Sequence, residues 1–125
     1  MANRELVKNY KAEAAIEACR IVKFGAADYV VTQGDAATDK LIGVTLPNLS
    51  IASGESCDVI HSGIVDVQLG GTVVRGDPIT SDASGQGVHA APAAGANNSV
   101  LGIALVSGIS GDIIPVLITL SSVQG

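Results

Sequence analysis

Four reactive side chains stand close together in the stretch "SCDVIHS": Cys57, Asp58, His61 and Ser62. A thiol beside an imidazole is the arrangement that covalent nucleophilic catalysis requires. In an extended strand, however, Cys57 and His61 lie on one face while Asp58 and Ser62 lie on the other. We therefore expect no enzyme, and a small β-barrel hydrolase using Cys57 and His61 is the least favoured alternative.

Other motifs that could carry chemistry have simpler structural explanations. A zinc site is not expected, because Cys19 and His89 are isolated from the first cluster and from each other. Arg75-Gly76-Asp77 spells a tripeptide recognised by cell-surface receptors, but a Gly and an Asp before a Pro predict a turn. The glycines match neither a phosphate-binding loop nor a dinucleotide fingerprint. We predict no cofactor, no metal and no small-molecule substrate.

The elements that must position these residues are short strands. The chain of 125 residues has 15 Gly, and its apolar content of 47% contains only two Tyr and one Phe. Runs rich in Val and Ile, separated by Gly, Ser, Thr and Asp, predict an all-β fold, a small barrel or a sandwich of the β-tulip type. Strands are expected over residues 18–24, 28–33, 40–46, 56–61, 63–69, 77–81, 86–90, 99–106 and 112–119.

The sequence also repeats itself, with a shorter loop in the second copy. This pattern predicts a pseudo-twofold β fold in which neither half can bury its apolar face alone. The aligned segments are Leu41-Ile42-Gly43-Val44 with Val100-Leu101-Gly102-Ile103, Ser53-Gly54-Glu55 with Ser110-Gly111-Asp112, Val59-Ile60 with Val116-Leu117, and, upstream, Ile21-Val22 with Ile79-Thr80.

Charge divides the chain into a basic leader and an acidic body. Residues 1–23 carry about +2 and residues 24–125 about −7 of the net charge of −5. The acidic body argues against binding along nucleic acid, and no apolar run is long enough for a membrane span. The start of the chain is charged and carries no secretion signal, so we expect synthesis in the cytoplasm. We predict an extended N-terminal arm at 1–17 that orders on a partner and a β-rich domain at 18–125; a frayed terminus and a short helix over 2–17 are the alternatives.

Several segments, in this order, resemble the small capsid decoration, or cement, proteins of tailed bacteriophages. The resemblance covers residues 10 to 125. The segments that carry it are Lys23-Phe24-Gly25-Ala26-Ala27-Asp28, Leu41-Ile42-Gly43-Val44, Gly71-Thr72-Val73 with Gly76-Asp77-Pro78, and Leu101-Gly102-Ile103-Ala104 with Gly111-Asp112.

The resemblance implies a structural virion protein on the outer surface of the expanded phage head. Its partners would be the major capsid protein and further copies of itself, as homotrimers at threefold and quasi-threefold sites that clamp neighbouring capsid subunits and stabilise the head. By position, Arg4, Lys8, Tyr10 and Lys11 would be the capsid contacts of the arm. Another phage structural β module, such as a tail, baseplate or spike adaptor, is the nearer alternative.

Overall fold

The computed structural model describes residues 6–46 and 50–124, and these residues form ten strands and no helix. The expected all-β fold is therefore confirmed, and the described residues contain no helix that could span a membrane. The first five strands are β1 (Leu6–Ala12), β2 (Ile21–Phe24), β3 (Val30–Gln33), β4 (Leu41–Thr45) and β5 (Ser56–Ser62). The others are β6 (Ile64–Gln68), β7 (Pro78–Ser81), β8 (Gly87–His89), β9 (Asn97–Ala104) and β10 (Ile113–Gln124).

Every strand expected from residue 18 onward is present, close to its predicted bounds, and β1 is the strand that the sequence did not predict. The helix alternative for residues 2–17 is wrong over the described part, because β1 pairs antiparallel with β5 and in parallel with β3. Local preference for helix loses here to strand pairing and to the burial of Ala12 and Ile16. Residues 6–17 of the expected arm are thus folded into the barrel, and Arg4 lies outside the described residues.

The strands form two units with the same topology. The N-terminal unit, β1 to β5, is a closed barrel, and the C-terminal unit, β6 to β10, is a five-stranded sheet. In both units the first strand lies beside the fifth, the fifth beside the fourth, the fourth beside the second, and the second beside the third. The parallel pair Ala12↔Val31 that closes the barrel has a counterpart in the isolated parallel bridge Leu69↔Gly87. The predicted pseudo-twofold repeat is confirmed.

Close approach between strands explains the glycine that both copies share. A Cβ on Gly43 would collide with the carbonyl oxygen of Ile60, and a Cβ on Gly102 would collide with that of Leu117. Only glycine lets the fourth and fifth strands of each unit meet at this distance. The repeated segments of the sequence therefore share one packing constraint, the close approach of the fourth and fifth strands at Gly43 and Gly102.

The strand register corrects one part of the predicted alignment. Ile21 pairs with Val44 in the N-terminal unit, and Pro78 pairs with Ile103 in the C-terminal unit. Ile21 therefore corresponds to Pro78 rather than to Ile79. Apolar character alone could not set this register, because both neighbouring residues of the strand are buried.

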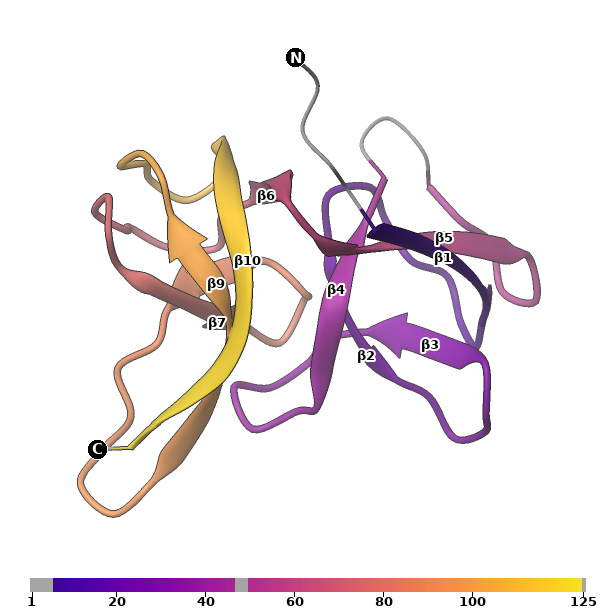
Figure 1. Cartoon of the computed structure of the whole chain (residues 1–125), viewed down its shortest axis with the longest axis horizontal. Coiled ribbons are helices and arrows are strands. Elements are labelled where there is room, and N and C mark those ends of the chain that lie inside the picture. The colour runs from indigo at the N-terminus through magenta and orange to yellow at the C-terminus, as the bar shows by residue number, and fades with distance from the viewer. Residues whose placement is uncertain (1–5, 47–49, 125) are drawn as a thin grey trace.

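The two units share a core. One cluster fills the barrel of the N-terminal unit, around Val22, Val31 and Val59. The second cluster joins the interior of the C-terminal unit to residues on the outside of the barrel, among them Val44 and Ile60. Figure 1 shows the units side by side, with β4 on the side of the barrel that faces the C-terminal unit. We infer that the two units unfold together.

Candidate functional site

The cluster around Cys57 is core structure. Cys57 and His61 both point inward, and the Cys57 side chain is 1% exposed. The Nδ1–H of His61 donates to the Ile42 carbonyl at 2.9 Å, so its Nε2 accepts from the Tyr10 hydroxyl at 2.8 Å. Burial, together with the Asp58 carboxylate, raises the pKa of the Cys57 thiol to about 11. With both ring nitrogens of His61 engaged and the thiol protonated, the pair is not an activated nucleophile.

The other reactive groups also have structural partners. Asp58 lies on the outer face, where it accepts from the side chain of Asn9 at 3.0 Å, so the predicted split of the cluster is confirmed. Asp77 accepts from the backbone N–H of Val74 at 2.9 Å, and Gly76 has a φ of 91°, which confirms the predicted turn. Within residues 6–46 and 50–124, no three His, Cys, Asp or Glu side chains are grouped to hold a metal ion.

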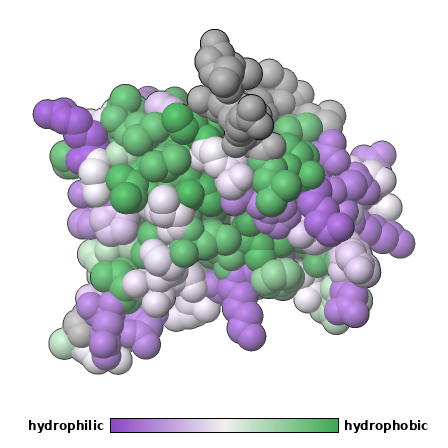
Figure 2. Space-filling view, in the orientation of Figure 1, coloured by the Kyte–Doolittle hydropathy of each residue, from purple (hydrophilic) through white to green (hydrophobic). Residues whose placement is uncertain are grey.

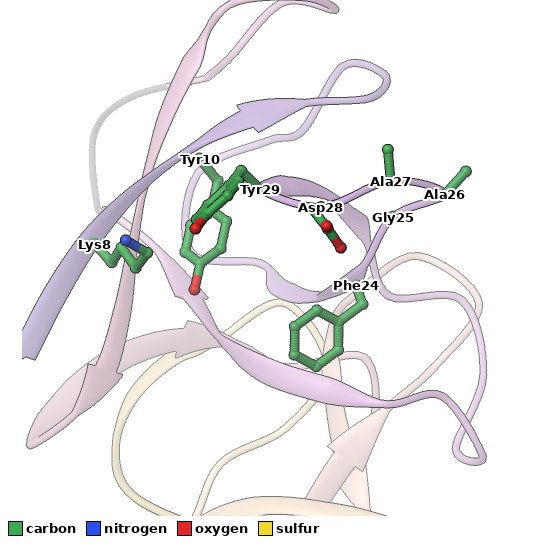
Figure 3. A pocket seen from close by; sticks show the side chains of 8 residues that line it. All are labelled: Lys8, Tyr10, Phe24, Gly25, Ala26, Ala27, Asp28 and Tyr29. Atoms are coloured by element: carbon green, nitrogen blue, oxygen red, sulfur yellow. The ribbon is translucent and has the colours of Figure 1, made fainter.

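A different surface gathers the three aromatic residues of the chain. An open hollow of about 470 Å³, called here the aromatic groove, lies between β1 and the loop that joins β2 to β3 (Figure 3). The Phe24 and Tyr29 side chains are 55% and 70% exposed, although large aromatic side chains usually gain stability from burial. The lining residues are Lys8, Tyr10, Phe24, Gly25, Ala26, Ala27, Asp28 and Tyr29.

Cationic side chains border the aromatic groove. The Lys8 ammonium lies 5.3 Å from the centre of the Tyr29 ring, within the range of a cation–π contact. Lys11 lies on the same strand and is exposed, and it lines a second hollow that shares Tyr10 and Tyr29. The groove therefore offers aromatic rings together with one cation, Lys8, and one carboxylate, Asp28, and the adjoining hollow adds a second cation, Lys11.

The internal repeat shows that the fold does not need these aromatic residues. The hairpin from β7 to β8 copies the hairpin from β2 to β3, and it carries Ser81 at the position of Phe24 and Gly85 at the position of Tyr29. Both Tyr29 and Gly85 have a left-handed backbone, with φ of 62° and 72°. A non-glycine residue in that conformation costs about 1 kcal/mol or more. Tyr29 is thus kept at an unfavourable position while its ring remains in solvent, which indicates a binding role.

The backbone of β1 adds a second feature to the groove. β3 pairs with β1 only at Lys11 and Ala12, so Leu6–Tyr10 have β5 as their paired neighbour on one side and the aromatic groove on the other. The N–H of Lys11 donates to the Tyr29 carbonyl at 2.9 Å, away from β5. Because backbone groups alternate along a strand, those of Val7 and Asn9 point to this same side.

The structure brings together three of the four predicted contact residues. Lys8, Tyr10 and Lys11 lie on β1, and Tyr10 reaches inward to His61 while Lys8 and Lys11 are exposed. Phe24 and Tyr29, which line the same groove, were not among the predicted contact residues. The signal was present in the sequence, since all three aromatic residues of the chain fall within residues 10–29, but the fold was needed to place β1 beside the hairpin.

The family model of the phage cement proteins matches residues 2–118. The chain belongs to the phage cement protein family. A solved structure supports the fold of this cement protein: the head fiber gp8.5 N base in bacteriophage phi29 has a TM-score of 0.69 at 16% sequence identity, and the match covers 98% of this chain and 100% of that chain. No curated protein matches the sequence. The family identifies the chain as a structural protein associated with the phage capsid in the virion, as the sequence resemblance predicted.

Proposed function

We propose that this cement protein binds the outer surface of the expanded phage head, clamps neighbouring major capsid subunits and catalyses no reaction. The observation that carries the proposal is the aromatic groove beside β1, a strand with Lys8 on one face and Lys11 on the other. Exposed aromatic rings and cations are typical of binding sites, because rings bury a large area at little cost in conformational entropy. The capsid contacts are Lys8, Tyr10 and Lys11, with Arg4 at the preceding end of the chain, and we add Phe24 and Tyr29.

An extended segment of the major capsid protein is the partner that suits this surface. Strand addition along β1 would satisfy the backbone groups of Val7 and Asn9, and the groove would receive an apolar side chain of the segment. Because Lys8 and Lys11 lie on opposite faces of β1, two carboxylates on the same segment would complement them, one on each face. The protein acts as a homotrimer at threefold and quasi-threefold sites, where three such contacts would strengthen attachment by about 10² to 10⁴ over one.

Cosedimentation with purified expanded capsids tests the proposal. The variant Phe24→Ser/Tyr29→Gly gives the groove the residues of the second hairpin, and we expect it to bind at least tenfold more weakly while it stays folded. Lys8→Gln/Lys11→Gln should weaken binding and reduce its dependence on salt. The control Asn97→Asp/Ser121→Asp makes the same change in net charge on exposed positions of β9 and β10 and should bind normally.

Two results would reject the proposal. The first is full binding of expanded capsids by both groove variants. The second is saturation of purified tails but not of heads by the wild-type protein, which would favour the tail or baseplate alternative.

A further inference from the structure

Exposed large apolar side chains form two separate groups among the described residues. Leu6, Val7, Phe24 and Tyr29 lie on β1 and around the aromatic groove. The second group lies in the C-terminal unit and is called here the apolar face; Figure 2 shows a broad apolar area over the half of the molecule that holds β9 and β10. Its members are Val74, Ile103, Leu105, Val106, Ile109, Ile113, Leu117 and Leu120.

The internal repeat shows what normally covers such a surface. A row of apolar residues crosses the outside of each unit in the same register, Val7, Ile60, Val44 and Ile21 in the first and Ile64, Leu117, Ile103 and Pro78 in the second.

The two rows differ in exposure. Ile60 and Val44 are 3% and 0% exposed, because the C-terminal unit packs over them. Their counterparts Leu117 and Ile103 are 37% and 38% exposed. Within the part of the chain that the structure describes, this row is therefore buried once, against β structure of the same chain, and its second copy stays partly exposed.

Beside this row, the C-terminal unit has large apolar residues at positions where the N-terminal unit has small or polar ones. Ile113 stands at the position of Ser56, and it is 57% exposed on the same side of β10 as Leu117. Ile109 stands at the position of Ala52, in the matching turn, and it is 61% exposed. Val74, 56% exposed, likewise stands at the position of Glu17. The N-terminal unit forms the same turns without these side chains, so folding does not explain them.

We propose that the apolar face is the surface through which copies of this chain pack against one another. The inference rests on the homotrimer of the proposed function and names its interface. Three observations favour a second copy over the capsid protein as the occupant. The corresponding row is already covered by β structure of this chain, and interfaces between identical subunits are the more apolar class. The aromatic groove lies on the other unit and remains free for the shell.

The need to stay soluble also favours a second copy as the occupant of the apolar face. A large exposed apolar surface is a liability for aggregation unless another surface covers it. Self-association covers the apolar face before the protein reaches the capsid.

Sedimentation velocity and light scattering on the full chain test this inference. We expect the wild type to have a mass that is a multiple of 12.5 kDa at micromolar concentration. The variant Val74→Glu/Ile109→Ala/Ile113→Ser, which copies residues of the N-terminal unit, should associate at least 100-fold more weakly. Leu117→Glu should do the same from the centre of the row. Circular dichroism should show both variants folded, and the groove variant Phe24→Ser/Tyr29→Gly should keep the wild-type mass.

The outcomes separate this inference from the proposed function. A wild-type protein that stays monomeric at about 100 μM, or face variants with the wild-type mass, would overturn the inference even if capsids are bound. A monomer whose Leu117→Glu variant loses capsid binding would assign the face to the capsid protein instead. A wild-type oligomer that dissociates when the apolar face is substituted, but does not bind capsids, would uphold the inference and reject the proposed function.

Discussion

Replacement of Gly102 by alanine tests the packing constraint that the two copies share. The added Cβ would meet the carbonyl oxygen of Leu117 and would lie 2.8 Å from its carbonyl carbon and 3.0 Å from the Cα of Ile118. These are backbone atoms of the neighbouring strand, so no side-chain rotation can relieve the contact and β9 and β10 must move apart. Overpacking that forces backbone shifts costs about 3 kcal/mol.

The change also stiffens the unfolded chain, which returns about 0.4–1 kcal/mol. The expected net loss is therefore about 2 kcal/mol in the free energy of unfolding, or roughly 8 °C in Tm for a domain of this length. Urea unfolding followed by circular dichroism measures the first quantity, and a thermal melt measures the second. Gly43→Ala should give a loss of similar size, because its Cβ would meet the backbone of Ile60 in the same way.

Gly71→Ala is the matched control. Its Cβ would lie 3.5 Å from the Val88 side chain, an ordinary contact, and Gly71 does not have a left-handed backbone. This variant should unfold within about 0.5 kcal/mol of the wild type. A Gly102→Ala protein as stable as this control would refute the argument that glycine is needed for strand approach.

Two further predictions concern the interior of the N-terminal unit. Tyr10→Phe leaves Nε2 of His61 without its hydrogen-bond partner and should lower the free energy of unfolding in urea by about 1 kcal/mol. The double variant Tyr10→Val/His61→Ile introduces the apolar residues that the second unit has at these positions, Val67 and Ile118. It should be no less stable than Tyr10→Phe, because it removes both polar partners. Because burial raises the pKa of Cys57 from 9.0 to about 11, the unfolded thiol ionises first; the stabilisation is complete below pH 9 and is lost as the pH rises through 11. The urea midpoint of the wild type should fall between pH 9 and pH 11, and Cys57→Val should reduce this fall. An equal fall in the wild type and the variant would contradict the assignment of the pH dependence to Cys57.

Local patterns were sufficient for the strands that carry their own signal. Val65 and Val67 in β6, and Leu69 directly after it, alternate with outward residues, and the structure buries all three, as the period of two predicts. The glycines at Gly54 and Gly111 marked turns that both have a left-handed φ. Such features depend on a few neighbouring residues, so the sequence alone contains them.

The strand β1 could not be predicted in this way. Its segment contains residues that favour helix, and its strand pairing depends on β5, about fifty residues away. The aromatic groove depends on that pairing, because Lys8 meets Tyr29 only when β1 lies beside the hairpin. The sequence therefore predicted contacts on the basic leader but not the aromatic groove that Lys8 and Tyr10 line.

The sequence by itself determined the all-β class, the turns and the internal repeat, because periodicity and glycine placement act over short distances. Only the tertiary structure decided which copy of each repeated surface is buried. Ile60 and Leu117 occupy equivalent positions on strands with similar local patterns, yet one lies in the core between the units and the other lies in solvent. That difference arises because the second unit covers this row of the first, whereas within residues 6–46 and 50–124 no strand covers the matching row of the second.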